Sequence, residues 1–243
     1  MNDTLKKAIA GLEERVSMHY RFHFLPGSAA ERDIEHIIAT QEDCFVRITA
    51  ELKVMPDFPL HYILLCSDEE VGALYEASCG VTIGTINGFA AEPDTVVAVY
   101  SDEVQCIGMH EDTHLLADLV AVQWQSFIME GLAMYMDGEW WGEPNERWVT
   151  RFLADGRYIP LAHLIPNDSF HDVPCEVSYP IAGAFTRYLI DLMGMETYLA
   201  SVYAANCDAD NPQGLPALLG KPINDIERDF LQWIRSQSQS YKG

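Results

Sequence analysis

The stretch that decides both the fold and the chemistry runs from Cys106 to Ala133 and reads CIGMHEDTHLLADLVAVQWQSFIMEGLA. Within it, His110, Glu111 and His114 form a His-Glu-x-x-His motif. Residues four positions apart lie on the same face of a helix, so both imidazoles can point at one metal ion. Glu111, next to the first histidine, can then face a water molecule bound to that ion. The motif therefore predicts a metal-binding helix.

A third protein ligand is required, because a catalytic zinc ion takes three and leaves one position open. Glu130, which begins the sequence Glu-Gly-Leu-Ala, is the natural candidate. The longer motif of the metzincins is absent, since Ala117 and Val120 stand where that motif has glycine and histidine. Cys106, one turn before His110, is expected to be a buried thiol and not a ligand.

The two histidines and the two glutamates are expected to have different roles in the reaction. His110 and His114 would bind zinc as neutral imidazoles and Glu130 as a carboxylate, and the ion would lower the pKa of its bound water to about 7. Glu111 is too close in sequence to bind the ion together with both histidines. It is placed instead to accept the proton of the water and to pass it to the leaving amine. Gly131 removes a side chain where the two helices must approach closely.

The composition narrows the class of protein. Of the 243 residues, 49% are hydrophobic, which is enough to build a large core. The formal net charge of −22 argues against nucleic acid as a partner, because phosphate binding needs a basic surface. No apolar run reaches the roughly 18 residues of a membrane span. Glu13 and Glu14 follow before a signal-peptide core develops, so the N-terminus is interpreted as a short amphipathic helix of a cytoplasmic protein without a membrane partner.

The residues before the motif alternate between strand and helix patterns. Met18–Leu25 places Tyr20, Phe22 and Phe24 on one face of a strand, and apolar residues recur at helical spacing from 29 to 54. The further expected elements are a strand over Leu60–Cys66, a short helix capped by Ser67, strands over 83–91 and 95–100, and the motif helix from an N-cap at Ser101 to about Ala121. This order is typical of an α/β lobe with a small mixed sheet.

The residues after the motif are mostly helical in pattern. A helix capped near Ser126 carries Glu130 and ends at Asp137-Gly138. Four more helices are expected at about 145–154, 180–193, 196–205 and 223–236, with Pro180 in the first turn of its helix. We therefore expect one α+β domain over residues 1–243. It would have an N-terminal α/β lobe (1–122) and a mainly helical C-terminal lobe (123–243), with the active-site helix between them.

Four segments carry a resemblance to a known group of enzymes. They are HEDTHLLA (110–117), FIMEGLAMY (127–135), SYPIAGAFTRYLIDLMG (178–194) and LLGKPINDIERDFLQWI (218–234). Together they resemble the gluzincin zinc metallopeptidases, and among these the peptidase MA-like families of bacteria, over most of the chain. The resemblance implies a zincin-like fold, one zinc ion per chain, and hydrolysis of peptide bonds in a peptide or protein substrate. It also implies that the strand nearest to the metal helix, within Gly84–Ala91, pairs with an extended substrate.

A hydrolytic zinc site also needs a hydrogen-bond donor for the oxyanion that develops during the reaction. Tyr179, just before Pro180, resembles a tyrosine that gluzincins place at this point, so it is the predicted donor. His171, in the sequence Ser-Phe-His-Asp, is the alternative donor.

The sequence departs from the family pattern in two places. Asp112 follows Glu111 where such families more often carry an apolar residue, so its charge must find a partner or face solvent. Metal-bound histidines usually donate their second ring nitrogen to a carboxylate or a carbonyl. In gluzincins that carboxylate often lies one turn beyond the third ligand, where this chain has Ala133 and Met134. Asp118 or Asp112 would have to substitute.

Three functions remain open at the level of the sequence. The leading hypothesis is a cytoplasmic zinc metallopeptidase with Glu111 as general base. The alternative is a catalytically inactive binding or regulatory module that keeps the zincin fold and the metal. Retention of Glu111 beside both histidines favours the enzyme, because a structural metal site needs no base. A zinc hydrolase that acts on a non-peptide amide fits the same residues.

Overall fold

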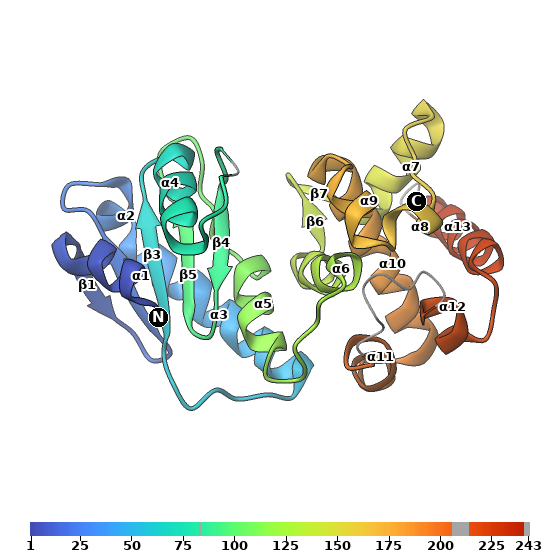
Figure 1. Ribbon diagram of the computed structural model, residues 1–243, viewed down its shortest axis with the longest axis horizontal. Coiled ribbons are helices and arrows are strands. Elements are labelled where there is room, and N and C mark those ends of the chain that lie inside the picture. The colour runs from blue at the N-terminus through green and yellow to red at the C-terminus, as the bar shows by residue number, and fades with distance from the viewer. Residues whose placement is uncertain (83, 206–213, 241–243) are drawn as a thin grey trace. The chain divides into compact units, whose positions relative to one another are not determined.

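The computed structural model describes residues 1–82, 84–205 and 214–240. The chain forms two compact units, Met1–Leu119 and Val120–Gly243. The first contains a mixed five-stranded sheet with helices, and the second is mainly helical (Figure 1). These features confirm the predicted α+β class. The expected start of a strand at Ile83 lies outside the described residues, and the strand expected over 83–91 begins only at Gly88.

The sheet of the first unit has the strand order β1-β2-β3-β5-β4. Its strands are β1 (Glu13–Val16), β2 (Tyr20–Phe24), β3 (Leu60–Leu65), β4 (Gly88–Ala91) and β5 (Thr95–Val99). The three inner strands run parallel, while β1 and β4 are antiparallel edges. Parallel strands covered on both faces favour continuous apolar runs, and every residue of β5 is buried.

Helices cover both faces of this sheet (Figure 1). Helices α1 (Asp3–Ala8) and α4 (Asp68–Cys79) cover one face, where Leu5 and Val71 share a core with Ile63 and Val97. The opposite face carries the buried Tyr20, Phe22 and Phe24, as predicted. There the ring of Phe45 from α3 (Ile34–Leu52) meets Tyr20 edge to face.

Two expectations for the first 54 residues are wrong in detail. The N-terminal helix is shorter than expected, since it gives way to a 3-10 turn, η1 (Ile9–Gly11), before strand β1. The long helix expected over 29–54 is divided at Asp33 into α2 (Ala29–Arg32) and α3. Every residue of β1 is exposed, so this strand has no apolar periodicity by which the sequence could indicate it.

The second unit is built around α6 (Ser126–Asp137) and α10 (Cys175–Met193). The remaining elements are β6 (Glu139–Trp140), β7 (Glu143–Pro144), α7 (Asn145–Asp155), α8 (Leu161–Leu164), α9 (Asn167–His171), α11 (Met195–Tyr198), a π-helical turn η2 (Leu199–Tyr203), α12 (Gly214–Leu219) and α13 (Ile223–Ser240). A Cβ atom on Gly131 would lie 3.0 Å from the carbonyl oxygen of Ala182 and would collide with Thr186 Oγ1. Gly131 therefore permits the close approach of α10.

Within the described parts of the chain, no helix has the length and the apolar character needed to cross a membrane.

A pair of histidines is built into the sheet, on the face covered by α1 and α4. His23 on β2 and His61 on β3 stack their rings at 5.3 Å, with His23 Nε2 3.0 Å from His61 Nδ1. Only 3% of His23 is exposed. Burial, and secondly the neighbouring His61, lowers the pKa of His23 to about 4. Burial also lowers the pKa of His61. Both rings are therefore neutral in the folded protein at pH 7.

We expect this pair to make the protein sensitive to mild acid. In the unfolded chain a histidine has a pKa of about 6.5. Between pH 6.5 and pH 4 the His23 side chain therefore binds a proton in the unfolded state but not in the folded state. The contribution of neutral His23 to the free energy of unfolding is fully present above about pH 6.5 and is lost as the pH falls toward 4. The free energy of unfolding should fall by about 2 kcal/mol between pH 7.5 and pH 5 for this reason. Urea unfolding at these two pH values should show a correspondingly smaller loss in His23→Gln. The exposed His36→Gln serves as the control, and an unchanged pH dependence in His23→Gln would contradict the assignment.

Candidate metal centre

The helix that carries the motif is α5 (His110–Ala117), which is shorter than the sequence predicts. The expected N-cap at Ser101 closes a turn instead, because Ser101 Oγ accepts the backbone N–H groups of Glu103 and Val104. Serine followed by acidic residues is a signature that helix N-caps share with such local turns. The chain then passes Gly108, whose φ of 146° favours glycine, and enters α5 at His110.

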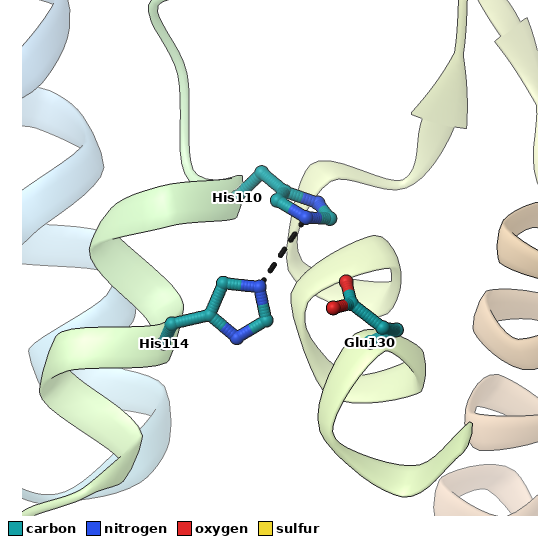
Figure 2. A group of neighbouring side chains, drawn as sticks. All are labelled: His110, His114 and Glu130. Atoms are coloured by element: carbon teal, nitrogen blue, oxygen red, sulfur yellow. Dashed lines mark hydrogen bonds between the residues drawn. The ribbon is translucent and has the colours of Figure 1, made fainter. Parts of the chain in front are cut away.

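His110 and His114 lie on the same face of α5, as their spacing requires. Their Nε2 atoms are 3.3 Å apart, and the ring planes meet at 84° (Figure 2). Two nitrogens bound to one tetrahedral zinc ion at about 2.0–2.1 Å would be separated by roughly this distance. Both rings are half-buried. The pair thus has the geometry of two imidazole ligands of one ion.

Glu130 lies in the second turn of α6 and is 9% exposed. His110, His114 and Glu130 each offer a ligand atom, and these atoms all lie within 4.8 Å of one another (Figure 2). Two imidazole nitrogens and one carboxylate are a donor set that catalytic zinc sites use, with the fourth position left for water. The three residues form a group that could hold a metal ion.

Glu111 is half-buried and lies against the edge strand β4. A Cβ atom on Gly88 would be 3.2 Å from Glu111 Oε1 and 3.6 Å from its carboxyl carbon. The carboxylate next to His110 therefore rests on the one position of β4 that has no side chain. Sequence reasoning did not identify Gly88. A glycine inside a strand can mark a site where another group approaches closely, which is the signal it offered.

Asp112 is completely buried and has found partners inside the first unit. Its Oδ2 accepts the Tyr20 hydroxyl at 2.5 Å and the side-chain amide of Gln41 at 3.0 Å. Burial, followed by the charge of Asp112, raises the pKa of Tyr20 far above its usual value, so Tyr20 stays a hydrogen-bond donor. Of the two outcomes expected for this charge, burial with partners is the correct one.

Asp118, the second carboxylate considered as a partner for the histidines, is the C-cap residue of α5. Burial and then the neighbouring carboxylate of Glu92 raise the pKa of Asp118 to about 6, whereas His114 acts in the opposite direction. The Oδ2 atom of Asp112, the other candidate, is engaged by Tyr20 and Gln41.

Tyr179 and His171 both belong to the second unit. Tyr179 lies within α10, which begins at Cys175, so the expected helix start at Pro180 is wrong. The Tyr179 ring stacks on Phe170 at 6.1 Å and contacts Trp140 edge to face at 5.7 Å. His171 Nε2 lies 3.0 Å from the hydroxyl of Ser126 at the start of α6. The role of either residue as an oxyanion donor stays a prediction.

Gln41 is a further residue that sequence reasoning missed, although it left a signal in the sequence. Gln41 is completely buried on α3. It follows Ile34 by seven positions and precedes Ile48 by seven, so it occupies a core position of an apolar repeat. A polar residue in such a position needs buried partners, which here include Asp112. Cys106, expected to be buried, is half-buried.

Two comparisons with known proteins were negative. A scan against models of protein families finds no match, and a search of characterised proteins finds no similar sequence. A proposal for function must therefore be based on the donor group, its neighbours and the resemblance in sequence.

Proposed function

We propose that this chain is a zinc-dependent hydrolase of peptide bonds, of the gluzincin type, which binds one zinc ion through His110, His114 and Glu130. The observation that supports the proposal best is the convergence of these three ligand atoms within 4.8 Å of one another. A carboxylate that is not one of the three, Glu111, adjoins the first histidine in the sequence.

The residues of the chain take separate roles in this proposal. Held by His110, His114 and Glu130, zinc would supply Lewis acidity, which makes a nucleophile available at neutral pH. Glu111 would accept a proton from the attacking water and return it to the leaving amine. Its neighbour on β4, Gly88, leaves room for the carboxylate. A structural site would use four protein ligands and no base, which is why Glu111 favours an enzyme.

The substrate would bind as an extended peptide along β4. This strand is the last in the sheet order, and its one neighbour within the sheet is β5. An edge strand offers backbone N–H and C=O groups to which an extended chain can add as a further strand. Gly88 belongs to this edge strand and lies beside Glu111. A peptide paired with β4 would therefore pass close to the proposed base. Tyr179 is the proposed donor to the oxyanion.

Metal analysis combined with a peptide-library assay tests the proposal. We expect one zinc ion per chain after dialysis at neutral pH, and cleavage of library peptides by the zinc-loaded protein. Removal of zinc with a chelator should abolish cleavage, and one equivalent of zinc should restore it, because the three ligands and Glu111 supply no nucleophile by themselves. Circular dichroism before and after chelation separates loss of zinc from loss of fold.

The outcomes distinguish the competing functions. A chain that fails to retain stoichiometric zinc has no site of the proposed kind. Retention of zinc without cleavage of any peptide, but with hydrolysis of simple amides, would indicate a non-peptide amide hydrolase. Retention of zinc without either activity would indicate a binding or regulatory module.

A further inference from the structure

A buried glutamine links the core of the first unit to the start of the metal helix. Gln41 lies in the middle of α3, has no exposed surface and directs its side-chain amide at two residues, Gly108 and Asp112. Its Oε1 accepts the backbone N–H of Gly108 at 2.8 Å, and its Nε2 lies 3.1 Å from the Gly108 carbonyl oxygen. The same Nε2 donates to Asp112 Oδ2 at 3.0 Å. A glutamine has two N–H donors and one carbonyl oxygen, so both ends of the side chain are used.

The two targets of Gln41 lie on either side of the first metal ligand. Gly108 precedes His110 by two residues and Asp112 follows it by two. Gln41 therefore holds the backbone that enters α5 and the side chain of the first turn at the same time. His110 and Glu111 lie between these two points.

Tyr20 on β2 completes the network. Its hydroxyl is 2.5 Å from Asp112 Oδ2 and 3.1 Å from the backbone carbonyl oxygen of Gln41. A hydroxyl has one proton, and the carboxylate is the nearer and stronger acceptor. Asp112 thus receives donors from a strand and from a helix that are 92 and 71 positions away in the sequence.

This network is better suited to fixing a position than to adding stability. Buried polar networks often contribute no more to stability than apolar side chains of the same volume, but they specify one arrangement of their elements. Helix α5 has eight residues, fewer than the roughly 12–15 that an isolated helix needs in water. Its first turn must therefore be held from outside.

We propose that Gln41 is a positioning residue for the metal centre. It fixes His110 and Glu111 by clamping Gly108 on one side of them and Asp112 on the other. The inference deepens the proposed function and rests on it for the identity of the metal. The hydrogen bonds of the clamp join protein groups and do not involve the metal.

The test compares Gln41→Met with Thr49→Val, in which another buried polar group on α3 is removed. Thr49 Oγ1 bonds to the carbonyl oxygens of Phe45 and Val46, which belong to the same helix. Zinc affinity is measured by competition with a chelator, and hydrogen exchange of the Gly108 amide is measured in the metal-free protein. Gln41→Met should bind zinc at least about 10-fold more weakly, a loss comparable to that caused by removing a group that orients a metal ligand. Its Gly108 amide should exchange at least about 10-fold faster, whereas Thr49→Val should leave both values as in the wild type.

The zinc affinity and the exchange rate at Gly108 each test one part of the proposal. Wild-type zinc affinity in Gln41→Met overturns the positioning role, and unchanged exchange at Gly108 overturns the clamp. Should the wild type bind no zinc, the proposed function fails, and exchange at Gly108 alone then decides whether the clamp exists. Should Gln41→Met fail to fold, Tyr20→Phe takes its place. It should weaken zinc binding several-fold and speed exchange in the first turn of α5, and no change in either would overturn the inference.

Discussion

Glu111→Gln is expected to lower the turnover of the best library peptide by about 1,000-fold while the protein keeps its zinc. General bases contribute roughly 10²- to 10⁴-fold to such reactions, and an amide of the same shape cannot accept a proton. The substitution keeps the volume of the side chain, so its packing against Gly88 is preserved. The metal ligands are untouched, and zinc stoichiometry should equal that of the wild type.

The measurement is the rate of peptide cleavage alongside zinc content, for the wild type, Glu111→Gln and Glu103→Gln. Glu103 lies exposed in the turn that precedes α5 and provides a matched change of charge. Full activity is expected of Glu103→Gln. If Glu111→Gln cleaved peptides as fast as the wild type, Glu111 would not be the base and the proposed mechanism would be wrong.

Glu130→Gln is expected to weaken zinc binding by about 1,000-fold and to remove activity for that reason. A neutral amide replaces the anionic ligand of the divalent ion, and the loss should exceed the roughly 10- to 100-fold cost of removing a residue that only hydrogen-bonds to a ligand. The side chain keeps its length, and its neighbour Gly131 maintains the close contact with α10. The fold of the second unit should be unaffected.

Chelator competition measures the zinc affinity of Glu130→Gln, and circular dichroism checks its fold. The exposed Glu139→Gln, just after α6, is the control and should bind zinc as tightly as the wild type. This experiment addresses the ligand that sequence spacing supports least directly, because Glu130 is outside the His-Glu-x-x-His motif. Wild-type affinity in Glu130→Gln would exclude it as the third ligand.

The parts of the fold that the sequence predicts well are those in which local pattern and burial coincide. The alternation of Tyr20, Phe22 and Phe24 places all three on the buried face of β2. Helix α6 ends where Gly138 indicates, with the left-handed φ of 78° that favours glycine at a C-cap, and it begins at Ser126, one residue after its N-cap Gln125. In both cases the signal lies within a few residues of the structure that it specifies.

The parts that the sequence does not predict depend on contacts between distant segments. The two histidines are related by helix geometry alone, so their spacing is sufficient to place both rings on one face. Asp112 is different, because its environment is made by Tyr20 and Gln41. No local rule distinguishes a solvated aspartate on a helix from one whose partners come from another strand and another helix. The helix start at His110 was missed for a related reason, since Ser101 closes a local turn.

Because α5 is short, the amount of folded protein in a cell should depend on metal binding. Eight residues cannot keep His110 and His114 facing one another in an unfolded chain, so the ligand pair exists only when the first unit is folded. An ion that binds the native state alone stabilises it, by about 2.7 kcal/mol when free metal exceeds Kd by 100-fold. The fraction of chains that survive proteolysis would then rise and fall with the supply of free zinc. The amount of this protein, and not only its activity, would then depend on the concentration of free zinc in the cell.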